Sequence, residues 1–486
     1  MGIGKPKKPK NSPNQSNSLA KELSKWDLLS IGIGAVIGWS WVIYAGVWST
    51  GAGSFGGVLA FIIGGVLCTF VGFAYAELSS SMPRAGGDIV FTFEGLGDRF
   101  AYFAGVFVGF GFLTLIIVET IMLPVILNSI GIPLLKLGEV YTIGGEKVYL
   151  SYIFISLIVN FIFAFLNIKG VKFSSAFQTI TVTVLLFAAV FYVFTGINLG
   201  ETANAKPFFT SFTGLSLILL MVPGFMSGFN VVAQAAEEAK IKPNMIGKIV
   251  VITVWVSTLF YVLVIIGASF AANESTRETA QVVVLESLVN LFNGSPYPKL
   301  FVGVAALIGM LTSWNAAYIA ASRVLFAFGR ARYFPKMFSE LHQQNKTPYK
   351  SVVILFIISS LAAFLGTSQT IYTSIVNLSG FLLLCSWLLV VLSFLRLRKK
   401  APAMDRPYKV PFGQFIGILA VLSIAMFLLL YTPLNPLGGL TIPELIVLSG
   451  ILIVILAIYF KNVHHSKIGK EERRKLLLST SSEKTE

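Results

Sequence analysis

Twelve apolar runs follow one another along almost the whole chain, and most of them are long enough to form a helix that crosses a bilayer. They lie at about 28–50, 55–79, 100–127, 150–168, 173–196, 213–236, 247–272, 299–328, 352–366, 371–395, 412–432 and 441–460. A crossing helix needs roughly 20 apolar residues. Because 55% of the 486 residues are hydrophobic and only 12% are charged, polar material is too scarce to cover a water-soluble protein. The sequence therefore predicts an all-α polytopic membrane protein with about twelve transmembrane helices.

Basic residues are distributed unevenly between the predicted loops. The chain has 37 Lys and Arg against 22 Asp and Glu, and with an inside N-terminus only five basic residues fall in outer loops, namely Lys136, Lys147, Lys206, Arg277 and Lys299. The other 32 lie on the inner side, which agrees with the rule that cytoplasmic loops of membrane proteins carry an excess of Lys and Arg. We therefore expect both termini to be cytoplasmic in a plasma or bacterial inner membrane. No basic stripe interleaved with aromatic residues accompanies these clusters, so nucleic-acid binding is not expected.

The chain divides into five predicted segments. Residues 1–25, rich in Lys, Pro, Ser and Asn, are expected to form a disordered cytoplasmic tail. Residues 26–198 and 199–400 are expected to form a first and a second five-helix repeat, 401–460 helices 11 and 12, and 461–486 a basic cytoplasmic tail. Both cysteines, Cys68 and Cys385, fall inside apolar runs, so a disulfide or metal framework is not expected. Gly144-Gly145, between VYTI and KVYL, fits either a small hairpin or a plain loop.

Two of the apolar runs contain residues that interrupt a helix. The first carries Gly32, Gly34 and Gly38, and each glycine costs roughly 1 kcal/mol of helix stability relative to alanine. The sixth carries Pro223-Gly-Phe-Met-Ser-Gly228, where proline removes a backbone donor. Since the runs are five helices apart, corresponding helices point in opposite directions, which predicts two inverted five-helix repeats plus two peripheral helices. At 1.5 Å per residue, both breaks lie about 17–20 Å from the ends of their helices, near the midplane of a ~30 Å core.

An interrupted helix at the midplane exposes backbone N–H and C=O groups that need partners. The N-terminus of a half-helix attracts an anion, and free carbonyls attract an ammonium or a small cation. A zwitterion such as an α-amino acid satisfies both. The alternative is close helix packing, for which Gly34-xxx-Gly38 alone would also serve. The pairing of two breaks at related positions favours a binding site.

Several motifs, in their order along the chain, resemble those of the amino acid-polyamine-organocation (APC) superfamily of permeases. They are Gly34-Ala-Val-Ile-Gly38, Tyr75-Ala-Glu-Leu followed by Met82-Pro-Arg-Ala-Gly-Gly87, Phe225-Met-Ser-Gly-Phe229 with Glu237-Glu238, Ala321-Ser-Arg-Val-Leu-Phe-Ala-Phe-Gly-Arg330, Phe334-Pro335 and Lys346-Thr-Pro348. The resemblance covers nearly the whole chain after residue 25. It implies ten core helices in two inverted repeats, two peripheral helices and transport of amino acids by alternating access.

The resemblance also implies roles for the two breaks. The substrate carboxylate would meet backbone N–H groups of Gly38, Trp39 and Ser40. The ammonium would meet carbonyls at the two breaks, from Val36, Ile37, Gly224 and Ser227, with Gly228 completing the second break. Two residues depart from the family pattern. Trp39-Ser40-Trp41 stands where Ser or Thr and then Gly are common, so the indoles either narrow the pocket or point into neighbouring helices, and Asn230 stands where an acid is common.

Three polar groups within the spans are candidates for coupling or gating. Glu119 is the one carboxylate deep in an apolar run, but it lies about 30 Å of helix rise beyond Arg99, which places it at the outer interface unless the helix is strongly tilted. Glu119 either binds the substrate or a proton, or it forms hydrogen bonds that are structural or belong to a vestibule. Glu237 falls near the inner end of the sixth helix, as an inner gate or a partner of nearby lysines. Asn230 is the third candidate.

Hydroxyl groups in the eighth helix offer a candidate Na⁺ site. Thr312 and Ser313 lie at the midplane and would share the ion with carbonyls of Gly34 and Ile37, or would simply bond to their own helix. Some Na⁺-independent relatives carry a lysine in helix 5 as a stand-in cation, and the stretch 177–185 has none. The coupling ion, H⁺ or Na⁺, therefore stays open.

The sequence as a whole predicts a secondary active transporter that carries α-amino acids through the lipid bilayer. No midplane cluster of catalytic residues suggests an enzyme, and no cofactor beyond a coupling ion is expected. An exchanger and a non-transporting amino acid sensor are the alternatives. The particular amino acid and any partner subunit are left open.

Overall fold

The computed structural model describes residues 19–478 except positions 133, 135, 144, 281, 433, 434, 436–438, 466 and 467. Within this part, ten helical segments are long and apolar enough to cross a membrane, and a bent pair, α1 and α2, makes an eleventh. The predicted polytopic helical fold is confirmed. Each of the twelve predicted runs coincides with helix, and the short ninth run forms the shorter apolar helix Tyr349–Leu365.

The spanning segments are long helices joined by short ones. The long helices are α1 (Lys25–Val36), α2 (Ser40–Gly51), α3 (Ser54–Ser81), α5 (Asp98–Ser129), α6 (Leu150–Lys169), α7 (Val171–Leu199), α8 (Phe212–Met226), α10 (Pro243–Ala271), α13 (Tyr297–Arg330), α14 (Tyr349–Ala362), α15 (Gln369–Lys400), α16 (Gly413–Leu430) and α17 (Ile442–Tyr459). The shorter ones are α4 (Gly87–Gly95), α9 (Val231–Gln234), α11 (Glu274–Thr279), α12 (Val283–Leu291), α18 (Lys470–Leu478) and the 3-10 turn η2 (Ala236–Glu238).

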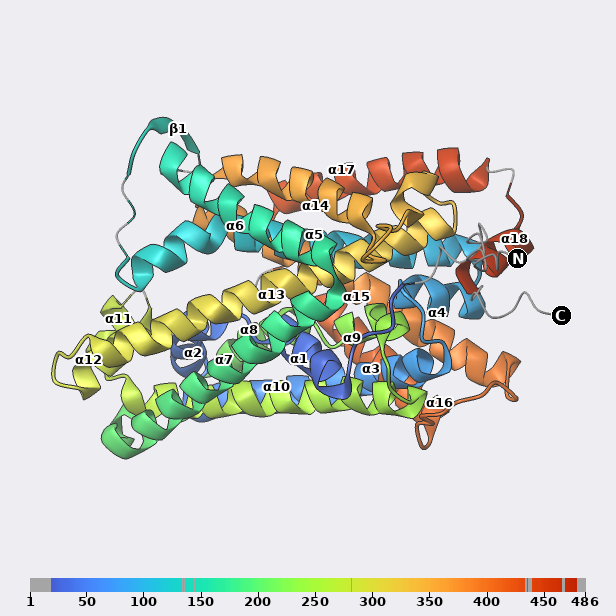
Figure 1. Ribbon diagram of the computed structural model, residues 1–486. Helices are drawn as coiled ribbons and strands as arrows, with labels where there is room; N and C mark the ends of the chain where they lie inside the picture. Colours follow the sequence, from blue (N-terminus) through green and yellow to red (C-terminus); the bar gives the residue numbers. More distant parts are fainter. Residues whose placement is uncertain are drawn as a thin grey trace, which may run out of the picture.

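One small sheet interrupts the helical architecture. Strands β1 (Glu139–Ile143) and β2 (Glu146–Tyr149) pair antiparallel. Of the two alternatives for this segment, the hairpin is therefore correct. Figure 1 shows β1, α11 and α12 at one end of the helical bundle and α18 at the other. We call these the β1 end and the α18 end.

The two interrupted helices run in opposite directions through the bundle. In Figure 1 the chain passes from α1 to α2 towards the β1 end, and from α8 to α9 towards the α18 end. The axis turns by 52° between α1 and α2. This antiparallel relation agrees with the pair of breaks expected from an inverted repeat.

The two breaks lie against each other. Gly228 has a φ of +148°, and a Cβ atom there would lie 2.7 Å from the carbonyl carbon of Ala35 and from the backbone nitrogen of Val36. A side chain of any size would push the second break away from the first, so only glycine permits this approach. Pro223 lies inside α8, where it removes one backbone donor shortly before the helix ends.

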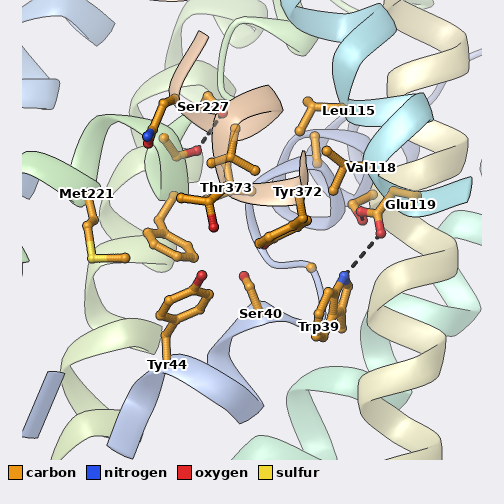
Figure 2. A pocket seen from close by; sticks show the side chains of 18 of the residues that line it. Trp39, Ser40, Tyr44, Leu115, Val118, Glu119, Met221, Ser227, Tyr372 and Thr373 are labelled. Carbon is orange, nitrogen blue, oxygen red and sulfur yellow. Dashed lines mark hydrogen bonds between the residues drawn. The ribbon is translucent and has the colours of Figure 1, made fainter. Parts of the chain in front are cut away.

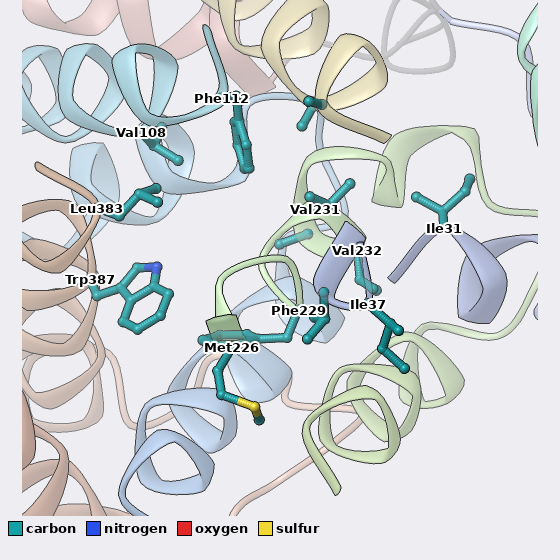
Figure 3. Packing of buried hydrophobic residues seen from close by; sticks show 14 of the residues in the cluster. Ile31, Ile37, Val108, Phe112, Met226, Phe229, Val231, Val232, Leu383 and Trp387 are labelled. Carbon is teal, nitrogen blue, oxygen red and sulfur yellow. The ribbon is translucent and has the colours of Figure 1, made fainter. Parts of the chain in front are cut away.

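Buried apolar side chains fill the space between α9 and the neighbouring helices. Figure 3 shows Ile37 beside Val232 and Phe229, with Trp387 of α15 on the other side of Met226. Phe229 and Trp387 lie with ring centroids 5.0 Å apart. All five side chains are at most 1% exposed. The segment between the break and α9 is thus embedded in apolar packing on the α18 side of the breaks.

The tail predictions need one correction. Residues 1–18 and 479–486 lie outside the described part of the chain. Residues 19–24, which we assigned to the disordered tail, are packed: Leu23 is fully buried, its N–H donates to the Glu238 carbonyl, and its own carbonyl accepts from the Lys240 N–H. The sequence did not show this because two leucines, Leu19 and Leu23, among polar residues are typical of a disordered tail, whereas the hydrogen bonds use backbone groups that every residue has.

Candidate functional site

A small cavity lies where the two helix breaks meet. Its volume is about 170 Å³, below the roughly 300–1,000 Å³ typical of sites for drug-sized ligands, so it suits a small molecule. Helices α1, α2, α5, α8, α13 and α15 contribute to its walls, together with the end of α16. The lining residues are Ala35, Val36, Gly38, Trp39, Ser40, Tyr44, Leu115, Val118, Glu119, Leu220, Met221, Gly224, Phe225, Ser227, Ser313, Tyr372, Thr373, Val376, Asn377 and Tyr431.

Eight of the residues singled out in the sequence line this cavity. They come from both breaks and from two further helices, and are Val36, Gly38, Trp39, Ser40, Gly224, Ser227, Glu119 and Ser313. Six others do not line it, namely Gly34, Ile37, Gly228, Asn230, Glu237 and Thr312. Ile37 belongs to the break but is fully buried, with its side chain in the apolar cluster of Figure 3.

The N-terminus of α2 borders the cavity. Trp39 is its N-cap and makes no side-chain capping hydrogen bond, so the first N–H groups of α2 have no partner from a capping side chain. The first N–H groups of any helix also lack intrahelical partners and carry a partial positive charge. A Cβ atom at Gly38 would lie 3.3 Å from Ser313 Oγ and 4.0 Å from Glu119 Oε1. The glycine therefore keeps this helix end open to an anionic group.

Two of the four carbonyls expected to bind an ammonium already accept hydrogen bonds from the protein. The Val36 carbonyl accepts from the Tyr261 hydroxyl at 2.9 Å. The Gly224 carbonyl accepts from the Ser227 hydroxyl at 2.6 Å and from the Ser227 backbone N–H at 3.3 Å. Because a carbonyl oxygen has two lone pairs, the Val36 carbonyl keeps one acceptor position for a ligand, whereas both positions of the Gly224 carbonyl are in use.

Glu119 lies in the cavity wall and not at the outer interface. Its Oε2 accepts from the Trp39 indole N–H at 3.1 Å, and its Oε1 accepts from the Ser313 hydroxyl. Figure 2 shows the Glu119 carboxylate beside Trp39, with the hydrogen bond from the indole drawn as a dashed line. The sequence had allowed Glu119 near the site only for a strongly tilted helix. Helix α5 has 32 residues, about 48 Å at 1.5 Å each, which exceeds a ~30 Å core, so the distance from Arg99 along the helix does not give the depth of Glu119.

The two tryptophans after the first break have different environments. Trp39 narrows the cavity, and its indole lies 6.5 Å from the Tyr372 ring. Trp41 is fully buried away from the cavity, against Tyr192 and Phe260. Of the two alternatives for the indoles, Trp39 therefore narrows the pocket, and Trp41 points into neighbouring helices.

Most of the apolar wall was missed by the sequence analysis. It comes from Tyr44, Met221 and Phe225 near the breaks and from Tyr372 and Val376 of α15. Figure 2 shows Tyr44, Tyr372 and Met221 around one space. The run 371–395 carries a single glycine, Gly380, and no proline, and the helix continues through it, so no helix break marked α15 as part of the site.

The candidate Na⁺ site is occupied by protein groups. The Thr312 hydroxyl bonds back to the Gly309 carbonyl at 2.6 Å and lies 3.4 Å from the Gly34 carbonyl. The side-chain amide of Gln178, from α7, fills the space directly beside Gly34 and donates to the Thr312 carbonyl at 3.1 Å. The Thr312 hydroxyl therefore lies closer to the carbonyl of its own helix than to the Gly34 carbonyl that would share a Na⁺ ion with it.

The orientation of the Gln178 amide is fixed by its neighbours. Its oxygen accepts from the Asn315 side-chain nitrogen at 2.9 Å. The Asn315 oxygen in turn accepts from the Ser174 hydroxyl at 2.7 Å and from the Asn167 amide at 3.0 Å. Because Asn315 receives two donors on its oxygen, its nitrogen must point to Gln178. The NH₂ group of Gln178 consequently points to Thr312 and Gly34.

Ion pairs to arginines close the α18 end. Glu237 pairs with Arg330 at 2.7 Å, and Glu238 pairs with Arg323 at 2.9 Å. Glu237 also accepts from the Ala85 N–H at 2.9 Å. Burial opposes ionisation of Glu237, yet the Arg330 guanidinium holds its pKa below the ordinary value. The partners are arginines of α13 and not the nearby lysines considered in the sequence, because the ridge of α13 faces η2 directly.

Comparison with known proteins agrees with this geometry. A family model described as amino acid permease matches residues 23–458. The branched-chain amino acid permease BcaP of Bacillus subtilis is 27% identical over 466 residues, covering 93% of this chain and 95% of the relative. The methylthioribose transporter of Bacillus subtilis is 26% identical, covering 86% and 89%. The L-asparagine permease of Escherichia coli is 24% identical, covering 90% and 87%.

Proposed function

We propose that this chain, which belongs to the amino acid permease family, is a secondary active transporter that carries an α-amino acid by alternating access. The observation that supports this most is the cavity of about 170 Å³ at the meeting point of two antiparallel helix breaks. Cavities at such breaks, near the midplane of inverted repeats, are where secondary transporters bind substrate. The family and its relatives are transporters and not enzymes.

The polar end of the substrate would sit between the two breaks. Its carboxylate would meet the N-terminal N–H groups of α2 at Gly38, Trp39 and Ser40, where the helix dipole favours negative charge. Its ammonium would meet the free lone pair of the Val36 carbonyl, with the Ile37 and Ser227 carbonyls of the two breaks as further acceptors. Glu119, which borders the same cavity, adds a negative group that favours an ammonium on the substrate.

The side chain of the substrate would be apolar. Beyond the breaks, the wall consists mainly of aliphatic and aromatic side chains such as Leu115, Met221, Phe225 and Val376. Burial of each apolar CH₂ contributes about 0.8 kcal/mol, so aliphatic substrates gain most from this wall. A relative that spans nearly the same length is a branched-chain amino acid permease. We propose that branched aliphatic amino acids bind preferentially.

The α18 end would face the cytoplasm, with both termini inside a cell membrane. Of the 37 basic residues, 32 fall in segments assigned to that side, as the positive-inside rule requires. The loop that follows α13 would then be cytoplasmic. An impermeant reagent that alkylates a Gln344→Cys variant in intact cells would contradict this orientation.

Proton coupling through Glu119 is our proposal for the driving ion. The Gln178 amide supports it, because its NH₂ group occupies the space beside Gly34 and bonds to the Thr312 carbonyl. The N–H donor makes, to the Thr312 carbonyl, the bond that a cation beside Gly34 would otherwise make. Glu119 can gain and lose a proton inside the cavity, and Trp39 and Ser313 donate to its charged form.

A pair of variants separates the two driving ions. In proteoliposomes with imposed gradients, Glu119→Gln should make uptake independent of the pH gradient, because glutamine cannot carry the proton. Ser313→Ala and removal of Na⁺ should leave uptake within about threefold. Glu139→Gln, an exposed acid of the hairpin, is the matched control and should behave as the parent. Loss of uptake on Na⁺ removal would make the sodium alternative correct. If uptake by Glu119→Gln depends on the pH gradient as it does in the parent, Glu119 is not the coupling group.

A further inference from the structure

A buried carboxylate, Asp88, lies outside the cavity and outside the spanning helices. Asp88 is the second residue of α4 and is 0% exposed. Its Oδ2 accepts from the Tyr75 hydroxyl and the Ser386 hydroxyl, each at 2.7 Å, and its Oδ1 accepts from the Gln234 amide at 2.8 Å. Asp88 thereby joins four elements, namely α3, α4, α9 and α15. One of these, α9, is the half-helix that follows the second break.

None of the groups that face Asp88 is a cation. The charged groups on the elements around α4 are engaged elsewhere: Glu77 with Arg398 and Arg406, Glu237 with Arg330, Glu238 with Arg323, Asp98 with Arg473, and Glu94 with Arg474. Of the side chains that donate to Asp88, Tyr75 is the titratable one. Within the described residues, no charged partner alters the ionisation of Asp88. Burial raises its pKa to about 6, against the opposing effect of the three donors.

The same face of α9 carries further polar atoms that lack partners. Asn230 and Gln234 are four residues apart, so they lie on one face of the turn, and both are fully buried. In the described part of the chain, neither polar atom of the Asn230 amide has a hydrogen-bond partner, nor has the Gln234 oxygen. Buried polar atoms without partners cost free energy that hydration would return. This face of α9 is therefore better satisfied in a hydrated, open arrangement.

We propose that Asp88 binds a proton when the α18 end is closed and releases it when that end opens to water. The proposal rests on the proposed alternating access, in which α9 moves away from α4 and α15. Burial in the closed state disfavours the charged form of the Asp88 carboxylate. In the open state, water around the carboxylate would restore its ordinary pKa. The proton is thus held more tightly by the closed state.

The sign of the pH dependence follows from this difference. The group binds protons better when closed, so closure is favoured at low pH and this advantage is lost as pH rises through about 6. If the open state had the ordinary pKa of 3.8, the ratio of closed to open molecules would change by up to about 100-fold across the full titration. A permanently neutral side chain at this position imitates the protonated, closed form.

Spin-label distances across the α18 end test the proposal directly. Labels at Lys240→Cys, after η2, and Gln344→Cys, after α13, would be introduced in full-length protein with Cys68 and Cys385 replaced by alanine. In nanodiscs between pH 8 and pH 5, the short-distance population should be constant at high pH and rise as pH falls through the pKa of Asp88 in the closed state, about 6. Asp88→Asn should keep the short distance over the whole range. Tyr75→Phe and Ser386→Ala each remove a donor to the charged form, so each should move this rise to higher pH.

Every outcome decides for or against Asp88. A parent without a pH step, or an Asp88→Asn variant with the step of the parent, would overturn the proposal. If Asp88→Asn does not fold, a rise at the unchanged pH in both Tyr75→Phe and Ser386→Ala would overturn it as well. Uptake of leucine by the same preparations separates the two levels. Intact uptake without a pH step rejects the role of Asp88 alone, whereas a pH step without uptake rejects the proposed transport.

Discussion

Replacement of Gly38 by leucine is expected to abolish amino acid binding while the protein remains folded. Even a Cβ atom at this position would approach Ser313 Oγ to 3.3 Å and Glu119 Oε1 to 4.0 Å. A complete leucine side chain would extend over the N-terminal N–H groups of α2 and fill part of a cavity of about 170 Å³. We expect affinity for leucine to fall by more than about 100-fold, which corresponds to roughly 2.7 kcal/mol.

Equilibrium binding to purified protein measures this effect, and Gly450→Leu is the matched control. Gly450 lies in α17 with nothing within 4 Å of an added Cβ atom, so the control inserts the same side chain into a spanning helix far from the breaks. It should bind as the parent does. If Gly38→Leu binds within about threefold of the parent, below ~0.7 kcal/mol, the break serves helix packing and is not a substrate site.

Replacement of Arg323 by methionine is expected to be the most destabilising single change at the α18 end. Arg323 is 0% exposed and donates two hydrogen bonds to the Glu238 carboxylate, each at 2.9 Å. Removal of one partner of a buried ion pair leaves an uncompensated charge, which typically costs 3–5 kcal/mol. The free energy of unfolding, measured with denaturant in detergent micelles, should fall by about this amount.

Two further variants show whether the loss comes from the stranded charge. The double variant Arg323→Met with Glu238→Leu should recover most of the stability, because two apolar side chains can replace a buried ion pair at little cost. Arg474→Met breaks a pair with Glu94 in which the arginine side chain is 49% exposed, and it should cost less than about 1 kcal/mol. Equal losses of unfolding free energy in Arg323→Met and Arg474→Met would contradict the account in which the buried Arg323–Glu238 pair stabilises the closed α18 end.

The parts of the fold that the sequence predicted are those set by one-dimensional patterns. The spanning helices follow from apolar runs, since a helix in lipid must satisfy its backbone within itself. The two breaks follow from local chemistry: Gly38 at the first and Pro223 with Gly228 at the second disfavour helix at any position. Because the breaks themselves form the centre of the site, much of the cavity wall could be named from the sequence.

The remainder of the site depends on distances that no local pattern records. The sequence could not fix the depth of Glu119, because the 32 residues of α5 are longer than a bilayer core requires and only tertiary structure determines how the helix lies. Tyr372 lies 333 positions after Trp39, yet their rings meet. Asp88 escaped notice because it lies outside the apolar runs, and its donors are ordinary polar residues of three other elements.

Concentrative uptake of radiolabelled leucine by proteoliposomes tests the central claim most directly. Purified protein would be reconstituted in vesicles with an inward pH gradient, and unlabelled amino acids would be added as competitors. The account predicts accumulation above the equilibrium level, competition by isoleucine and valine, little competition by glutamate, and loss of accumulation in Gly38→Leu. Saturable leucine binding without uptake, under any imposed gradient or with leucine inside the vesicles, would contradict it and make this chain a sensor.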